Sequence, residues 1–229
     1  MNDLSRQRMP LYALLVKYRE IGLTLILAIL IVGVGLRNSS FLDPGKLLFI
    51  VEDTATLAIL AAGMMCVILV GSIDISIAGI MALSAMVAGI VMRNSLTITE
   101  VARIVDGVET TVTVKESLPL VWLILIGMGV GGLCGLINGL IIAYGNVLSI
   151  VTTLGMQYII YGMAHIVSDG QAVYKKDMSD AFVAFTRESF LGVNAKIWIM
   201  LAVFVLMYIF VTYFRSGRHL YASALEPTA

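Results

Sequence analysis

Residues 54–92 decide the fold, and they read TATLAILAAGMMCVILVGSIDISIAGIMALSAMVAGIVM. Asp74 is the only residue in this stretch with a charged side chain, and it separates an apolar run of 20 residues, Thr54–Ile73, from one of 18 residues, Ile75–Met92. A helix needs roughly 20 apolar residues to cross the hydrocarbon core of a bilayer. The stretch therefore predicts two membrane-spanning helices joined by a tight turn at Gly71–Asp74.

Four further segments are similarly apolar and uncharged: Ile21–Leu36, Leu120–Gly145, Val147–Ser168 and Ile197–Phe214. They are apolar on every face, whereas the strands of a membrane β-barrel alternate between apolar and polar residues. With 59% hydrophobic and 13% charged residues, the chain carries more apolar surface than a water-soluble core holds. We predict an all-α polytopic transmembrane bundle of about six spans, which forms a single domain over residues 1–229.

The connections between the spans are of two kinds. Gly145–Asn146 is a second tight turn, whereas residues 93–119 and 169–196 are long polar loops. Basic residues precede the first span and follow the last, at Arg215 and Arg218, and an even number of spans places both ends in the cytoplasm. The long loops are then expected to be extracytoplasmic, although nine of the 15 Lys and Arg residues lie outside in this topology.

The first long loop contains a β-branched alternation, Thr-Thr-Val-Thr-Val, within residues 97–114. Asp106-Gly107 is a pair typical of a two-residue hairpin turn. The pattern fits a small extracytoplasmic β-hairpin and, equally well, a solvated irregular loop.

The charges and cysteines argue against several classes of function. Lys plus Arg and Asp plus Glu each number 15, so the net charge is zero and no nucleic-acid partner is indicated. Cys66 and Cys134 lie in apolar runs without a neighbouring Cys or His at ligand spacing, so we interpret both as packing residues and predict no metal or other cofactor. His165 and His219 are expected at opposite membrane faces, which argues against an intramembrane enzyme.

Asp74 and Ser76 allow two roles. A carboxylate in hydrocarbon is costly, so Asp74 is expected to face protein, water or a broken helix end. In one interpretation Ser72 or Asp74 caps the helix that follows a cytoplasmic hairpin. In the other, Asp74 and Ser76 line the solute path or its gate.

A second group consists of Gly127, Gly131, Gly135 and Gly139, which recur every four residues. This spacing leaves a groove along a helix and permits close helix approach in lipid. Asn138 lies in the same region and is able to hydrogen-bond across the contact. Packing alone is the favoured interpretation, and a contribution of Asn138 to the solute path is the alternative.

A third group lies on the segment Val147–Ser168, where Gln157, Tyr161 and His165 are spaced i, i+4 and i+8. This spacing places the three side chains on one helix face. Neutral hydrogen-bonding groups and aromatic rings are suited to a sugar-conducting path. Hydrogen bonding between helices near the outer interface is an equally good interpretation, and a metal-ligand role for His165 is weaker than either.

Four strings resemble one family, the permease subunits of ABC importers of the ribose, xylose and autoinducer-2 type, which are related to the branched-chain type. GSIDISIAG, residues 71–79, is similar to the family's Gly-Ile-Asp-Leu-Ser-Val-Gly-Ser segment. GGLCGLINGLIIA, residues 131–143, and IVTTLGM, residues 150–156, resemble its glycine-rich helix and the run that follows. RSGRHLYA, residues 215–222, resembles its cytoplasmic Gly-Arg-x-x-Tyr-Ala segment.

The resemblance implies a permease in the bacterial inner membrane that moves a sugar or sugar-like solute by alternating access. It implies membrane lipid and three protein partners: a cytoplasmic ATP-binding cassette ATPase, a second permease subunit and an extracytoplasmic solute-binding protein. Gly217, Arg218 and Tyr221 are then expected to couple the chain to the ATPase. The sequence has no phosphate-binding loop, so the ATPase partner, and not an enzyme activity of this chain, is expected to supply the energy.

The alternative is a secondary transporter or channel that is not coupled to an ATPase. Such proteins more often carry several intramembrane charges, whereas this chain offers only Asp74 and, at the edge of a span, Glu52 and Asp53. Chains of the resembled family continue for about another hundred residues beyond the position of Ala229. We therefore expect the chain to be incomplete relative to that family.

Overall fold

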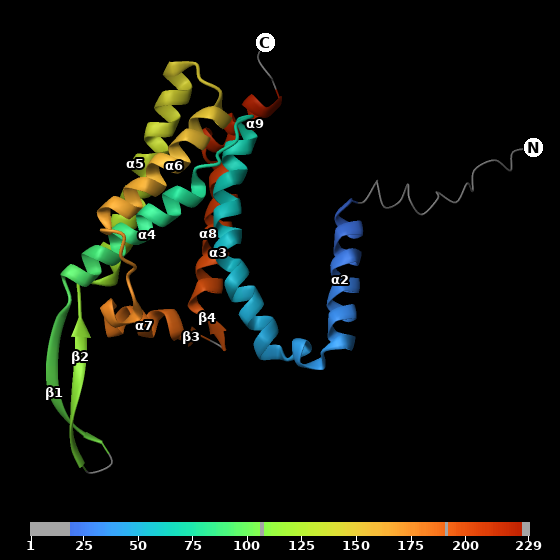
Figure 1. Ribbon diagram of the computed structural model, residues 1–229. Coiled ribbons are helices and arrows are strands. Elements are labelled where there is room, and N and C mark those ends of the chain that lie inside the picture. Colours follow the sequence, from blue (N-terminus) through green and yellow to red (C-terminus); the bar gives the residue numbers. More distant parts are fainter. Residues whose placement is uncertain (1–18, 106–107, 191, 226–229) are drawn as a thin grey trace, which may run out of the picture. The chain divides into compact units, whose positions relative to one another are not determined.

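The computed structural model describes residues 19–105, 108–190 and 192–225 (Figure 1). The chain divides into two units, residues 1–53 and residues 54–229, and each is described by itself. The basic residues before Arg19 and the Asp106-Gly107 pair, both used in the sequence analysis, lie outside the described residues.

The first unit contains α2, Arg19–Arg37, followed by the short 3-10 helix η1, Ser39–Leu42. The predicted apolar segment Ile21–Leu36 is thus helical, although its apolar part, Ile21–Arg37, is shorter than the other apolar helices. A Cβ placed on Gly35 would lie only 2.6 Å from Leu42 Cδ1. The glycine therefore allows η1 to pack directly against the last turn of α2.

The next helix, α3, spans Pro44–Leu69. It begins ten residues before the predicted span Thr54–Ile73 and ends four residues before that span does, so both predicted ends are wrong. The chemistry of the helix start explains the earlier beginning. Asp43 Oδ1 accepts a hydrogen bond from Gly45 N–H at 2.8 Å, and Pro44 suits the first helical position because no N–H is needed there.

Three helices form the core of the second unit: α4, Ile77–Asn94, α5, Leu120–Gly145, and α6, Ser149–Val167. α4 packs against both α5 and α6. The buried apolar residues of this core are Leu83, Cys134, Ile160 and Ala164. Cys134 is therefore a packing residue, as predicted.

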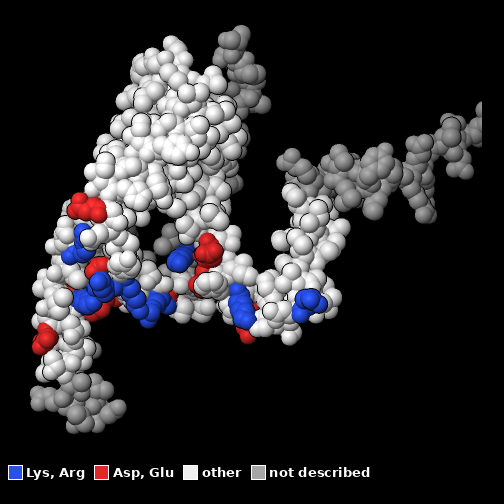
Figure 2. All heavy atoms as spheres, in the orientation of Figure 1, with Lys and Arg blue, Asp and Glu red and all other residues white. Residues whose placement is uncertain are grey.

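The predicted all-α polytopic bundle is confirmed. Among the described residues, five helices are long and apolar enough to cross a bilayer, namely α3, α4, α5, α6 and α8, Ala195–Tyr213, and α2 adds a shorter apolar one. The bounds of α5 agree with the predicted segment at both ends. On the face drawn in Figure 2 the body of α4–α6 carries no charged side chain, as expected of helices surrounded by lipid.

Both long polar loops contain regular structure. In the first, β1, Thr97–Val105, pairs antiparallel with β2, Val108–Glu116, and Val101 lies opposite Val112. The hairpin, rather than the irregular loop, is therefore the correct alternative. The second loop contains η2, Lys175–Asp177, α7, Asp180–Arg187, and the two-residue strands β3, Ser189–Phe190, and β4, Val193–Asn194.

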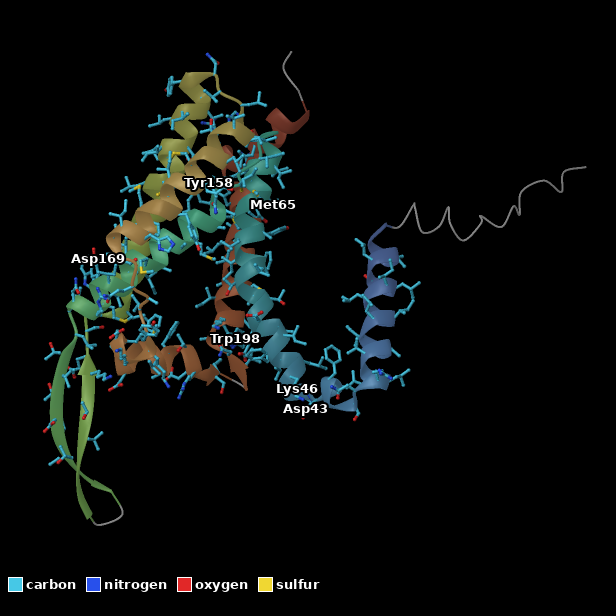
Figure 3. The ribbon with its side chains drawn as sticks, viewed as in Figure 1. Asp43, Lys46, Met65, Tyr158, Asp169 and Trp198 are labelled. Carbon is cyan, nitrogen blue, oxygen red and sulfur yellow. The ribbon has the colours of Figure 1, made fainter. Side chains whose placement is uncertain are left out.

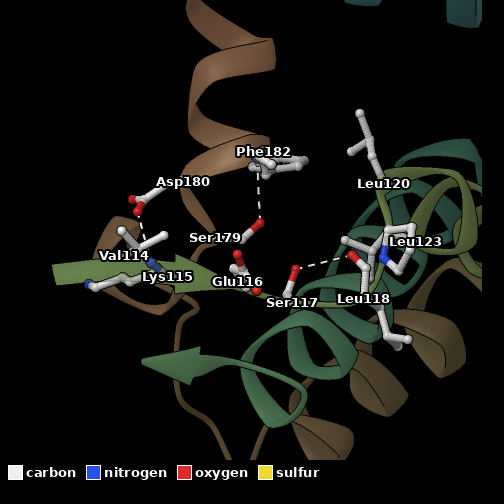
Figure 4. A pocket seen from close by; sticks show the side chains of 12 residues that line it. Val114, Lys115, Glu116, Ser117, Leu118, Leu120, Leu123, Ser179, Asp180 and Phe182 are labelled. Atoms are coloured by element: carbon white, nitrogen blue, oxygen red, sulfur yellow. Dashed lines mark hydrogen bonds between the residues drawn. The ribbon is translucent and has the colours of Figure 1, made fainter. Parts of the chain in front are cut away.

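The base of the hairpin is joined to α7 (Figure 4). Lys115 N–H donates to Asp180 Oδ2 at 2.8 Å, and Lys115 Nζ donates to the Lys176 carbonyl oxygen at 2.8 Å. A pocket of about 360 Å³ lies between the end of β2, the start of α5 and the start of α7. The two loops thus form one structure at the same end of the helices.

The last helix, α9, Arg215–Leu225, follows α8 after a single residue. Gly217 is buried at this bend, and a Cβ there would meet a carbonyl oxygen of α8 and lie 2.7 Å from Val211 Cα. Arg218 Nη1 donates to the Tyr213 carbonyl oxygen at 3.0 Å. The first turn of α9 therefore packs against the backbone of α8.

We expect Gly217→Ala to lower the thermal stability of the detergent-solubilised protein, because backbone atoms cannot move aside as a flexible side chain can. Overpacking of this kind costs roughly 1–3 kcal/mol. The matched control is Gly63→Ala in α3, where a Cβ would meet nothing within 4 Å. The control should be neutral or slightly stabilising, because alanine favours a helix by about 1 kcal/mol. Equal stability of both variants would contradict the close packing of α9.

Candidate functional site

The connection between α3 and α4 enters the helix bundle. Figure 1 shows the chain leaving the end of α3 and running back along the bundle before α4 begins. Ile73 N–H donates to Ser149 Oγ at 3.3 Å, and Thr153 Oγ1 lies 3.3 Å from the Ile73 carbonyl oxygen. The chain turns at Gly71, which has a φ of 73°, as predicted. The tight turn does not reach Asp74, because residues 72–75 continue without a turn and side chains of α6 bind the backbone at Ile73.

Asp74, Ser76 and Asn138 form a continuous hydrogen-bonded chain. Asp74 Oδ1 accepts from Ser76 N–H at 2.8 Å and from the Ser76 hydroxyl at 2.6 Å. Asn138 Nδ2 donates to Ser76 Oγ at 2.7 Å. The carboxylate thus orders the residue that precedes the first turn of α4, where its charge also complements the positive end of the helix dipole.

This polar chain lies well inside the bundle. Ser76 is fully buried and Asn138 is 3% exposed. Asn138 lies seven residues before the end of α5 at Gly145, which corresponds to a depth of about 10 Å along the helix. A carboxylate and its partners are therefore placed within the apolar length of the spans, where ionisable residues are costly unless they serve a purpose.

A second contact holds the start of α4 against α6. Gln157 Oε1 accepts a hydrogen bond from Gly79 N–H at 2.8 Å. A Cβ on Gly79 would lie 2.9 Å from both the Gln157 carbonyl oxygen and Gln157 Oε1. Gly79 is thus needed for the close approach of the helices, and Gln157 satisfies a first-turn N–H that has no partner within its own helix.

A pocket of about 320 Å³ borders the polar chain. It is lined by Val67, Val70, Ser72, Ile73, Asp74, Gly135, Asn138, Gly139, Ile142, Ala143 and Thr153. Asn138 Oδ1 is buried and has no hydrogen-bond partner in the described part of the chain. The pocket therefore combines an apolar wall with side-chain oxygen atoms from α5, α6 and the connection between α3 and α4.

The four glycines of α5 do not face the same neighbour. A Cβ on Gly131 would lie 3.4 Å from Ser84 Oγ, and one on Gly127 would lie 3.9 Å from the Ser84 carbonyl oxygen. Gly135 and Gly139 line the pocket instead. The cause is helical geometry, since each step of four residues turns the direction of the side chain by about 40°.

The predicted stripe on α6 also divides. Gln157 is half-buried against α4, whereas Tyr161 is 49% exposed and His165 is exposed as well. The rings of Tyr161 and His165 pack edge to face with their centroids 5.4 Å apart. Tyr158, on the same helix, points away from the core (Figure 3) and is 73% exposed. Tyr161 and His165 thus form an aromatic pair on the outer surface of the described bundle.

Sequence reasoning missed the structural roles of three residues that hold the site. Gly79 allows the close approach of α4 to α6, and Ser149 and Thr153 contact the backbone of Ile73. Gly79 carried a signal, because a glycine inside a helix pattern often marks a close backbone approach. Ser149 is the first residue of α6, and only the fold brings it to the connection between α3 and α4. Among the described residues, no group of three or more His, Cys, Asp or Glu side chains is arranged to hold a metal ion.

A polar segment enclosed by apolar spans defines the chain as a multi-pass helical membrane protein with an intramembrane polar site, the arrangement typical of transporters and channels. Residues 46–229 match the family described as the permease component of branched-chain amino acid transport systems. The chain therefore belongs to this family, whose members are multi-pass proteins of the inner membrane.

Curated relatives agree with the family. The ribose import permease protein of Bacillus subtilis is 31% identical over 205 residues, which cover 89% of this chain and 56% of the relative. The autoinducer 2 import system permease protein of Yersinia pestis is 32% identical over an alignment that covers 89% of this chain and 57% of the relative. The ribose import permease protein of Haemophilus influenzae is 29% identical over an alignment that covers 86% of this chain and 54% of the relative. The chain thus spans about half the length of these relatives, and no solved structure matches it.

We expect Gly79→Ala to push α4 away from α6, because the Gln157 carbonyl oxygen is part of the helix backbone and cannot turn aside. The cost should be roughly 1–3 kcal/mol of unfolding free energy. Gly155→Ala on α6, where a Cβ would meet nothing within 4 Å, is the matched control. Thermal unfolding in detergent measures both, and a Gly79→Ala protein as stable as its control would contradict this contact.

A double-mutant cycle on Ser76→Ala and Asn138→Ala tests the hydrogen bond between α4 and α5. Interhelical hydrogen bonds in membranes contribute about 0.6 kcal/mol on average and up to about 1.7 kcal/mol. We expect a coupling energy in this range, because Asn138 Nδ2 and Ser76 Oγ are both buried. Strict additivity of the two substitutions would show that the side chains do not interact.

Proposed function

We propose that the protein is the transmembrane permease subunit of an ATP-binding cassette importer for a sugar or sugar-like solute. Membership of the permease family supports this assignment. The relatives named for ribose, L-arabinose and autoinducer 2 import support a sugar-like solute in particular. The observation that carries the proposal is the polar chain of Asp74, Ser76 and Asn138 beside a pocket at membrane depth.

The solute path is proposed to include this pocket. Hydroxyl, amide and carboxylate oxygens are suited to a polyhydroxylated solute, which brings many hydrogen-bond donors and no charge. Asn138 Oδ1 supplies an acceptor without a partner in the described chain. Tyr161 and His165 are proposed to line the path further along α6, where their exposed rings offer aromatic contacts to a sugar and a second subunit completes the wall. Gln157 is proposed to lie between this ring pair and the pocket.

The proposed movement of the helices during transport depends on the contacts that α4 makes with α5 and α6. Asn138 of α5 and Gln157 of α6 contact its first turn and the residue before it. The small residues Gly79 and Gly131 let α4 lie close to both neighbours. Alternating access is proposed to occur by sliding of these packed helices, with the hydrogen bonds to Ser76 and Gly79 setting one of the two states.

The partners are proposed from the two ends of the helices. With both chain ends in the cytoplasm, α9 with Gly217, Arg218 and Tyr221 lies on the side of the ATPase. The close packing of Gly217 against α8 supports a coupling role, because it allows a push on α9 to reach a spanning helix. The hairpin and α7 lie at the opposite end, where a solute-binding protein delivers solute. A second permease subunit completes the path.

The direct test is uptake of labelled sugars by cells that produce the protein with its partners. We expect Asp74→Ala to reduce uptake strongly at unchanged membrane abundance, and Asp74→Asn to reduce it less, because the amide oxygen still accepts from Ser76. Arg37→Gln, at an exposed position in the last turn of α2, is the control and should leave uptake unchanged.

Two outcomes would contradict the proposal. One is wild-type uptake by Asp74→Ala at normal abundance, since the carboxylate would then have no part in transport. The other is uptake that persists when the cells lack ATP but keep a membrane potential, together with purification of the protein without an ATPase. That result would favour a secondary transporter or channel.

A further inference from the structure

The two tryptophans of the sequence lie at equivalent places in two spanning helices. Trp122 is the third residue of α5 and Trp198 is the fourth residue of α8. α5 and α8 cross the membrane in the same direction, because α6 returns between them. Both indole rings therefore lie at one membrane boundary, and both are exposed, Trp122 by 57% and Trp198 by 40%.

Trp198 is held by a neighbour that is itself exposed. Its ring packs edge to face on Phe190 with the centroids 5.8 Å apart, and its Nε1–H donates to the Phe190 carbonyl oxygen at 3.2 Å. Phe190 is 66% exposed, and its pairing with Val193 in the β3–β4 hairpin holds it in place. Because the one polar atom of Trp198 already has a partner, the ring is free to lie in a layer with little water.

The surroundings change from apolar to charged at this point. A pocket of about 390 Å³ lies beside the pair and is lined by Phe185, Glu188, Ser189, Phe190, Ala195, Trp198 and Ile199. In Figure 3 Trp198 lies at the start of α8, next to β3 and β4. Figure 2 shows charged side chains gathered at this end of the second unit and a wholly uncharged surface on the body of α4–α6. The aromatic pair therefore occupies the boundary between the two.

The length of α5 supports the same boundary. Tyr144, the last residue but one of α5, is 82% exposed. From Trp122 to Tyr144 the helix rises about 33 Å, close to the roughly 30 Å of a bilayer core. On α8, Trp198 and Tyr213 are only about 22 Å apart, so Tyr213 does not mark the opposite boundary. The level of Trp198 rests instead on its charged neighbours Glu188 and Lys196 at the start of the span. Amphipathic aromatic rings are enriched at both membrane interfaces.

We propose that Phe190 and Trp198, with the pocket beside them, form a lipid-binding anchor that lies in the headgroup and glycerol layer of the outer leaflet. The occupant is bilayer lipid, because the pocket is lined by two exposed aromatic side chains at the start of an apolar span, where such rings are enriched at the membrane interface. The anchor fixes the height of α7, and α7 in turn holds the base of the β1–β2 hairpin through Asp180. The outer structures are thereby kept at a constant height above the spans.

The test uses Trp122→Phe, which leaves Trp198 as the only tryptophan. The protein is reconstituted into phosphatidylcholine vesicles whose acyl chains carry bromine either near the headgroup or near the chain end. We expect greater loss of Trp198 emission with bromine near the headgroup, and little loss with aqueous iodide. Strong quenching by iodide without quenching by bromine would place the ring in water and overturn the proposal. No quenching by either agent would show that protein covers it, and would overturn the proposal equally.

A second variant tests the role of Phe190. Adding Phe190→Ser to the Trp122→Phe protein should shift Trp198 emission to the red and weaken bromine quenching, because the ring loses its apolar neighbour. Ile98→Ser on the hairpin, where Ile98 is 61% exposed, is the control and should change neither quantity. Unchanged emission in the Phe190→Ser protein would contradict the anchor. The result does not depend on which solute is transported, so the proposed function can fail while the anchor holds.

Discussion

A main chain that enters a bundle surrounded by lipid must find hydrogen-bond partners for its polar groups, and residues 71–79 meet this constraint in part with side chains of α6. Ser149 and Gln157 of α6 bind the backbone at Ile73 and Gly79. Asn138 of α5 binds the side chain of Ser76. The arrangement of α4, α5 and α6 depends on these contacts.

The same constraint explains the pattern of small residues. Glycine at position 79 lets a helix start approach the backbone of α6, and glycine at position 131 lets α5 approach Ser84. Gly135 and Gly139 leave room beside Asp74 instead of packing. One helix face thus provides both close contact and a pocket, because a four-residue repeat slowly turns around the helix axis. A permease needs both properties.

The fold was largely predictable from the sequence, whereas the arrangement of the site was not. Long uncharged runs determine where spans occur, since lipid imposes this requirement on each segment separately. The start of α3 was missed because a helix can extend into water through a good cap at Asp43, which hydropathy does not detect. Asp74, Ser76 and Asn138 were each singled out, but their contact spans 62 residues of sequence and needs the packed helices to form. Gln157 was grouped with Tyr161 by helical spacing, although burial separates them.

The central claim is that the connection between α3 and α4 packs into the bundle, with Ser76 fully buried and the backbone at Ile73 and Gly79 bonded to α6. Hydrogen–deuterium exchange of the protein in lipid nanodiscs, followed by mass spectrometry, tests it directly. Peptides covering residues 71–79 should exchange slowly, because the Ile73 and Gly79 N–H groups have partners on another helix. Exchange as fast as that of the turn at residues 146–148 would show that the segment is an ordinary surface turn and would contradict the account.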